Sequence, residues 1–204
     1  MKHLILASGS PRRRELMSQV GLDFTVVTSD ADENIKEMEP EDYVRELSSI
    51  KAQSVLEQYA DKDDSVIVIG ADTIVYHKGE ILTKPKDEED AFRILKSLEG
   101  QIHQVYTGVT VILCQEAGSY AGSTFSEKTD VEVYDMEDGE IAAYVSTGEP
   151  LDKAGAYGIQ GSFAAYIRGI HGDYTNVVGL PLGRLCHEIK KLLEEQENDQ
   201  AGRN

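Results

Sequence analysis

Two periods of hydrophobic spacing alternate along this chain, and they predict a series of strands and helices. Unbroken apolar runs, or apolar residues at every second position, predict strands, whereas apolar residues three or four positions apart predict helices. By this pattern, strands are predicted at 4–6, 24–28, 66–72, 105–113, 125–134 and 164–171. Helices are predicted from Pro11, from Pro40 to about 56, and at 88–98, 137–146 and 181–194. A hairpin turning at Lys78 and Gly79 is predicted after the third strand, a loop at 61–64, and a disordered polar tail at 195–204.

The order of these elements predicts an α/β fold with a mixed sheet, because strands and helices mix without strict βαβ alternation. With 204 residues, 40% of them hydrophobic, the chain is long enough to form one core, and we expect a single domain over 1–194. Its 20 basic and 37 acidic residues give a net charge of −17, which argues against nucleic acid or an anionic membrane as the main partner.

The cysteines and the apolar runs indicate the cellular compartment that we expect for the protein. Cys114 and Cys186 have no metal-binding spacing, and a chain with two cysteines is most simply a reduced intracellular protein in which they fill the core. No run approaches the roughly 18 apolar residues of a membrane span. We therefore expect a soluble, cytoplasmic protein.

Three consecutive arginines stand where the first helix is predicted to begin. Ser10 is the expected N-cap and Pro11 suits the first helical position, so Arg12, Arg13 and Arg14 would lie beside unpaired backbone amides. Positive charges at this end of a helix dipole cost roughly a few tenths of a kcal/mol each unless an anion compensates them. The segment therefore predicts a phosphate site, with a solvated basic turn as the alternative.

A buried carboxylate is predicted in GADTIV, residues 70–75, where four apolar residues lead to Asp72 at the end of a strand. A carboxylate there is costly unless it is used or paired. Asp72 could hold a metal ion or take a proton from water, and its alternative role is to cap a turn.

The acidic turn 30–34 supports several interpretations. A solvated turn is the simplest, and a carboxylate that reaches a divalent metal, with Glu33 as the candidate, is the functional one. Asp30 and Asp32 also fit the first positions of an EF-hand loop, but Ile35 stands where that loop needs glycine. A haloacid-dehalogenase-type phosphatase would need a later acidic Gly-Asp pair, which the chain lacks.

Lysines and glycines supply the remaining candidates. Lys51, Lys84 and Lys86 could neutralise a polyphosphate that the overall acidity otherwise repels. The loop 148–161 has glycines around Lys153 and Gln160, so its backbone can approach a ligand and the glutamine amide can pair with a base edge. Each lysine alone could be solvated, and the loop could be a plain flexible turn.

Several signatures of other enzyme classes are absent from the sequence. It contains no GxxxxGK[ST], no GxGxxG after the first strand, no HExxH and no GxSxG. These absences argue against P-loop nucleotidases, dinucleotide-binding enzymes, zinc proteases and α/β-hydrolases.

Long motifs in a fixed order nevertheless resemble one family. SGSPRRREL, GADTIV, TKP, GQIHQVYTGV, GEPLDKAGAYGIQG and GDYTNVVGLPL are similar to those of the Maf proteins, also called septum formation proteins, across nearly the whole chain. The resemblance implies an elongated mixed β-sheet flanked by helices with a central cleft between two lobes, similar to inosine triphosphate pyrophosphatases. It also implies hydrolysis between the α- and β-phosphates of a nucleoside triphosphate, with a divalent cation, Mg²⁺ or Mn²⁺, and a possible homodimer.

By that resemblance, Asp72 is the proton acceptor, and the phosphate and metal site is lined by Ser8, Arg12, Arg13, Glu33, Lys51 and Lys84. Arg12, Thr73 and Gln160 match the specificity positions of the branch that acts on dTTP and UTP, while Glu33 and Asp72 would bind the metal. Whether Asp72 serves as base, metal ligand or both stays open at this point.

Two other functions remain possible from the sequence. The same site could bind nucleotide without turnover in a regulator of septum formation, or the protein could be a phosphomonoesterase. Release of pyrophosphate, of inorganic phosphate or of neither separates the three.

Overall fold

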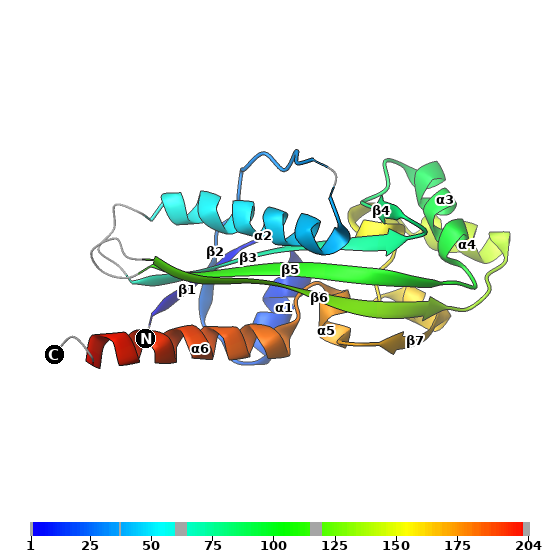
Figure 1. Cartoon of the computed structure of the whole chain (residues 1–204). Coiled ribbons are helices and arrows are strands. Elements are labelled where there is room, and N and C mark those ends of the chain that lie inside the picture. Colours follow the sequence, from blue (N-terminus) through cyan, green and yellow to red (C-terminus); the bar gives the residue numbers. More distant parts are fainter. Residues whose placement is uncertain (1, 37, 60–64, 115–119, 202–204) are drawn as a thin grey trace. The chain divides into compact units, whose positions relative to one another are not determined.

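Figure 1 shows the computed structural model of the chain, which describes residues 2–36, 38–59, 65–114 and 120–201. The loop predicted at 61–64 lies outside the described residues. The elements, in order, are β1 (His3–Ala7), α1 (Pro11–Gln19), β2 (Phe24–Val26), α2 (Pro40–Glu57), β3 (Val66–His77), β4 (Glu80–Leu82), α3 (Glu88–Leu98), β5 (Ile102–Cys114), β6 (Tyr120–Val133), α4 (Asp138–Val145), the 3₁₀ turns η2 (Glu149–Asp152), η3 (Ala154–Ala156) and η4 (Ser162–Tyr166), β7 (Ile167–His171), α5 (Tyr174–Val178) and α6 (Leu182–Ala201).

The strands form a mixed sheet, as the sequence predicted. Their order is β2-β1-β3-β5-β6-β7, with β4 paired to β3 as the second arm of the predicted hairpin. β1 is parallel to both β2 and β3, whereas β3 with β4 and β6 with β7 are antiparallel. The parallel pairs need crossover connections, which α1 and α2 provide.

The residues cluster into two compact units. The first contains Met1–Asp72, Gly108–Ser126 and Gly179–Asn204, and the second contains Thr73–Thr107 and Glu127–Val178. Strands β3, β5 and β6 contribute residues to both units. The expected single domain over 1–194 stays a prediction.

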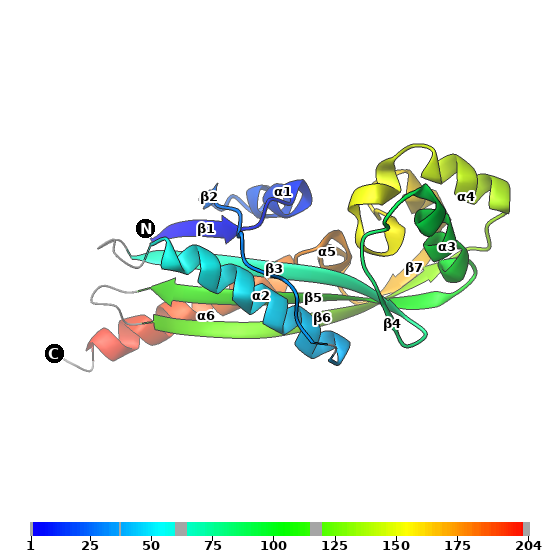
Figure 2. The ribbon, with the colours of Figure 1, turned by 90° about the horizontal axis from the view of Figure 1, so that it is seen from above.

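In the first unit, α2 covers one face of the strands and α1 and α6 lie on the other (Figures 1 and 2). Buried aliphatic residues fill the layer beneath α2, and Cys114 belongs to this core as expected. Two glycines let α2 lie against strand backbone, because a Cβ atom at Gly70 or at Gly108 would overlap a carbonyl oxygen of the helix. Between these contacts, the buried hydroxyls of Ser48 and Thr110 are 2.9 Å apart and hydrogen-bonded.

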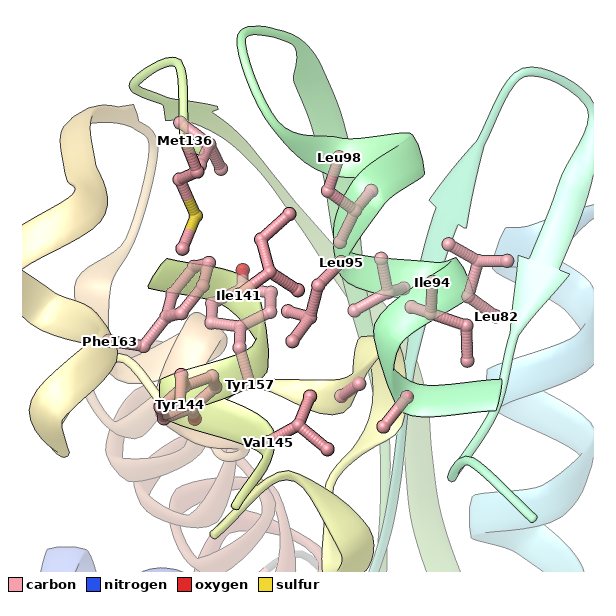
Figure 3. Packing of buried hydrophobic residues seen from close by; sticks show 14 of the residues in the cluster. Leu82, Ile94, Leu95, Leu98, Met136, Ile141, Tyr144, Val145, Tyr157 and Phe163 are labelled. Carbon is pink, nitrogen blue, oxygen red and sulfur yellow. The ribbon is translucent and has the colours of Figure 1, made fainter. Parts of the chain in front are cut away.

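In the second unit, the core lies between helices α3 and α4 and the 3₁₀ turns (Figure 3). Phe163 is fully buried and packs against the tilted ring of Tyr157 at a centroid distance of 4.9 Å. The segment before β7 forms η4, which turns the Phe163 ring into the core. For this reason β7 begins at Ile167 and not at 164.

Helix α6 differs most from the sequence prediction, because it continues to Ala201 and not to about 194. Residues 195–201 of the segment that was predicted to be a disordered tail are thus part of this helix in the structure. Within the helix, Lys190 pairs with Glu194 at 3.6 Å and Lys191 with Glu195 at 3.9 Å, each at the i,i+4 spacing that supports a polar helix. None of the helices in the described part of the chain has the length and apolar character needed to span a membrane.

A buried histidine makes the stability of the second unit dependent on pH. His103 is fully buried, its Nε2 atom is 2.8 Å from the Tyr157 hydroxyl, and burial lowers its pKa to about 3. The nearby His77 lowers this pKa further, whereas Asp130 raises it. Burial also raises the pKa of Tyr157, so the phenol keeps its proton and can donate it to the imidazole.

We expect the free energy of unfolding to fall as the pH decreases from about 6.5 toward 3, by up to about 1.4 kcal/mol per pH unit from His103 alone. The unfolded chain binds a proton at this residue near pH 6.5, whereas the folded protein does so only near pH 3, so acid favours unfolding. When urea unfolding of H103Q is measured across this pH range, its free energy of unfolding should change less with pH than that of the wild type. The exposed His187 offers the matched control H187Q, and an unchanged slope in H103Q would contradict the prediction.

Candidate active site

The end of β1 and the start of α1 place the first group of predicted site residues, all in the first unit. β1 ends at Ala7, and Pro11 begins α1, as predicted. Ser10 occupies the N-cap position, but its side chain makes no capping bond. The hydroxyl of Ser8 instead accepts a hydrogen bond from the Ser10 amide at 3.3 Å, which holds the turn.

Arg13 is anchored in this turn. Its Nε atom donates to the carbonyl oxygen of Gly179 at 2.8 Å, and a terminal nitrogen donates to the Ser8 hydroxyl at 2.9 Å. Burial lowers the pKa of Arg13, and the charge of Asp72 acts in the opposite direction. Because arginine stays protonated in proteins, this half-buried group is a fixed positive charge that acts on Asp72.

Two further charges act on the Arg13 guanidinium. The Arg12 side chain lowers its pKa and the Glu33 carboxylate raises it, so both lie within its electrostatic range. Arg14, the third arginine of the run, is exposed. An anion that bound here would relieve the repulsion between Arg12 and Arg13.

Lys51 joins the two predicted carboxylates. Its ammonium group lies 2.6 Å from Oδ1 of Asp72 and 3.0 Å from Oε2 of Glu33. The side chains of Lys51 and Asp72 are 13% and 14% exposed, whereas Glu33 is 52% exposed, so the Lys51–Asp72 pair is the one shielded from solvent. The three residues come from α2, from β3 and from the loop after β2, and the structure brings them together. Asp72 lies within β3, which continues to His77, so the prediction that it ends a strand was wrong.

The two aspartates of the acidic turn are exposed, and each accepts a hydrogen bond from a nearby group. Asp32 accepts a hydrogen bond from the Asn34 amide at 2.9 Å, and Asp30 accepts one from the Ser54 hydroxyl at 3.2 Å. Among the residues that the structure describes, no cluster of three or more His, Cys, Asp or Glu side chains could hold a metal ion by itself. A cation here would therefore depend on few protein ligands.

Tyr43 is a residue that the sequence interpretation missed. In the sequence it belongs to the apolar pattern of the helix, but burial and the charges of Asp72 and Glu33 raise the pKa of its hydroxyl. It therefore lies beside the two carboxylates and keeps its proton. The available signal was its position two helical turns before Lys51, which places both side chains near one face of α2.

The second unit carries the remaining predicted residues, and Thr73 is half-buried there. It follows Asp72 directly in β3, and its hydroxyl oxygen is 2.9 Å from that of Thr107 on β5. Lys84 and Lys86 are exposed and flank the buried Pro85, after β4. Lys153 donates within its own loop, to the Glu149 carbonyl and to Asp152, each at 2.6 Å.

Gln160 is exposed and lies in a tight turn that hydrogen bonds hold in place. The Gly161 amide donates to the Gly158 carbonyl at 3.2 Å, which closes the turn around Gln160. The Glu149 carboxylate accepts bonds from the amide and the hydroxyl of Ser162, and its other oxygen accepts from Tyr144 at 3.1 Å. A Cβ atom on Gly161 would overlap the Glu149 carboxylate, which would then have to shift from its present bonds.

Comparisons with known proteins agree with these motifs. Residues 3–192 match the family model described as "Maf: Maf-like protein". A protein of Agathobacter rectalis named dTTP/UTP pyrophosphatase is 51% identical over 201 residues, which covers 94% of this chain and 98% of that protein. One of the same name from Lachnoclostridium phytofermentans is 49% identical, with 94% and 96% covered. The solved structure of the Staphylococcus aureus Ham1 protein aligns with 66% of this chain and 73% of its own at a TM-score of 0.36 and 12% identity, a likeness too low to support an inference.

Proposed function

Because the chain belongs to the Maf family, we propose that it is a nucleoside triphosphate pyrophosphatase that converts dTTP and UTP to the monophosphate and pyrophosphate. The observation that carries the proposal is the convergence of Lys51, Asp72 and Glu33 with the half-buried charge of Arg13. These are the groups that an attack on a phosphorus atom needs, since positioning and charge neutralisation supply most of its catalysis.

The proposed reaction is attack of water on the α-phosphorus. A water oxygen forms a bond to this phosphorus, the bond from phosphorus to the bridging oxygen of the β-phosphate breaks, and pyrophosphate leaves. Asp72 accepts the proton of the attacking water, which a carboxylate can do at neutral pH. Ser8, Arg12, Arg13 and Lys51 hold the phosphate oxygens, and Lys84 and Lys153 add positive charge.

A divalent cation, Mg²⁺ or Mn²⁺, fits the donor set of the first unit. The carboxylates of Glu33 and Asp72 both reach one ammonium group, so their oxygens converge on one cationic position. Mg²⁺ is usually bound by one or two carboxylates together with water and substrate phosphates, which matches a site with two. When bound, the ion would neutralise the charge that develops on the phosphates and lower the pKa of a bound water.

We further propose that Thr73 and Gln160 recognise the pyrimidine base, together with Arg12. Their hydroxyl, amide and guanidinium groups can pair with polar atoms of a base edge. Hydrogen bonds hold the turn around Gln160, which supports this role. Because the turn is already ordered, Gln160 would lose less conformational entropy when a ligand binds.

The proposal predicts the product and the position of the bond that breaks. With UTP and Mg²⁺ in ¹⁸O-labelled water, the protein should release pyrophosphate and place the label in UMP, as measured by direct pyrophosphate detection and mass spectrometry. Chelation of the metal should abolish turnover. Inorganic phosphate as the first product would indicate a phosphomonoesterase, and nucleotide binding without any product would indicate a regulator without turnover.

A further inference from the structure

The ammonium group of Lys51 lies at the point where the carboxylates of Glu33 and Asp72 converge. It is 2.6 Å from Oδ1 of Asp72, to which it donates a hydrogen bond, and 3.0 Å from Oε2 of Glu33. The Lys51–Asp72 pair is largely shielded from solvent. The oxygens that suit a divalent cation therefore already face a positive charge of the protein itself.

Backbone packing in the first unit sets this position of Lys51. Gly70 and Asp72 are two residues apart in β3, so both point to the side of the sheet that faces α2. A Cβ atom at Gly70 would overlap the carbonyl oxygen of Ser48 and lie 2.7 Å from the amide nitrogen of Ala52. Both of these α2 residues are close to Lys51 in the sequence. The contact at Gly70 thus places the Lys51 stem beside the Asp72 carboxylate, whatever the site binds.

The Lys51 ammonium group and a divalent cation compete for the two carboxylates. Mg²⁺ binds carboxylate oxygens directly, and the ammonium group already occupies the oxygens that converge. Two positive charges on the same pair of oxygens repel each other, and the low exposure of Lys51 and Asp72 reduces the screening by water. The carboxylates therefore bind the ion well only after the ammonium group has moved.

We propose that Lys51 occupies the cation position until a nucleotide binds, and that the triphosphate then draws the ammonium group away, so that the divalent cation enters with the nucleotide. Lysine suits this role, because its charge lies at the end of a flexible four-carbon stem and can move without a change in the helix. The phosphate oxygens offer the ammonium group new partners, which frees Glu33 and Asp72 for the ion. This inference rests on the proposed function, in which these two carboxylates bind the metal.

The first test measures Mn²⁺ binding without nucleotide, from the electron paramagnetic resonance signal of the free ion. K51M keeps an unbranched stem but removes the charge, so it should bind Mn²⁺ at least about tenfold more tightly than the wild type does, a difference of about 1.4 kcal/mol. K51R keeps a positive charge beside the carboxylates and should bind Mn²⁺ as weakly as the wild type. Equal Mn²⁺ affinities of the wild type and K51M would overturn the inference.

Lys96 gives the matched control, because it also joins two carboxylates. Its ammonium group lies 2.9 Å from Asp138 and 3.3 Å from Glu99, but its side chain is 45% exposed, in the second unit. K96M changes the net charge by the same amount and should bind Mn²⁺ within about twofold of the wild type, because water screens exposed charges. The double variant K51M/D72N should lose most of the affinity that K51M gains. A gain that persisted would place the ion elsewhere and contradict the inference.

A measurement on the wild type decides the question even if K51M does not fold. The ¹⁵N NMR signal of the Lys51 ammonium group can be assigned by its absence in K51R. It should keep its chemical shift when Mg²⁺ alone is added, and change when Mg²⁺ is added with α,β-methylene-UTP, an analogue that cannot be cleaved between these phosphates. An equally large change with Mg²⁺ alone would show that the ion displaces Lys51 without nucleotide, against the inference.

The outcomes separate this inference from the proposed function, since Mn²⁺ binding without nucleotide needs no turnover. If the wild type releases pyrophosphate from UTP but K51M gains no Mn²⁺ affinity, the inference fails and the pyrophosphatase assignment stands. If the wild type releases no pyrophosphate, the proposed function fails, and the Mn²⁺ affinities still test whether Lys51 excludes the cation.

Discussion

Replacement of Asp72 by asparagine is expected to lower kcat for pyrophosphate release from UTP by about 10³-fold or more. Asparagine keeps the shape of the side chain but cannot accept a proton or carry the charge that faces Lys51 at 2.6 Å. Lys51 retains its partner Glu33 at 3.0 Å, so the ammonium group is not left unpaired and the fold should be kept. Steady-state kinetics and urea unfolding of D72N measure the two effects separately.

The same chain offers a matched control for D72N. Asp42 also forms an ion pair, with Arg45 at 3.1 Å, but its side chain is 63% exposed on α2, outside the proposed site. D42N should therefore retain wild-type kcat and KM. A D72N protein with near-normal turnover would remove Asp72 from the mechanism, whereas equal losses in D72N and D42N would point to a general effect of lost charge.

The site could be predicted from sequence where a local pattern carries the chemistry. The polar turn before Pro11 places Ser8 and the arginines, and an apolar strand that runs into Asp72 marks a carboxylate in need of a partner. Lys51 has no such local signal, since it is one lysine on an amphipathic helix. Its pairing with Asp72 depends on how closely α2 packs on the strands, which is a tertiary property.

Besides Tyr43, the sequence interpretation missed buried polar residues that resemble core in the sequence. Thr107 alternates with valines in a strand, and Asn176 lies in a helix of five residues that the pattern did not predict. That helix is nucleated by Asp173, whose carboxylate accepts bonds from the amide and the hydroxyl of Thr175 at 2.7 Å. Such turns are fixed by side-chain bonds and not by hydrophobic period, so periodicity alone cannot find them.

The sequence predicted which segments form strands, but it did not predict the order of the strands in the sheet. Every predicted strand is present, with ends shifted by a few residues, because alternation reports only whether a face is buried. That β1 lies between β2 and β3, parallel to both, results from long-range pairing. Gly70 and Gly108 are the sequence signal for the packing of α2, because a glycine within a strand often marks a site where another backbone approaches closely.

Substitution of alanine for Gly108 is expected to lower the free energy of unfolding by about 3 kcal/mol or more, the upper part of the range for overpacking. The added Cβ would overlap the Val44 carbonyl and lie 2.7 Å from the Arg45 amide nitrogen, and both belong to the backbone of α2 and cannot rotate away. The helix would have to move off β5, and with it Lys51. Urea unfolding should therefore show a lower midpoint, and the folded fraction should show a raised KM for UTP.

Gly70 gives an independent test of the same contact, and Gly183 gives the control. A Cβ at Gly70 would overlap the Ser48 carbonyl and lie 2.7 Å from the Ala52 amide nitrogen, so G70A should destabilise the protein by a similar amount. At Gly183, in α6, a Cβ would meet nothing within 4 Å, and G183A should leave stability unchanged or raise it by up to about 1 kcal/mol. If G70A and G108A unfolded at the wild-type urea concentration, α2 could not rest on the strand backbone. The close approach that brings Lys51 to Asp72 would then need another cause.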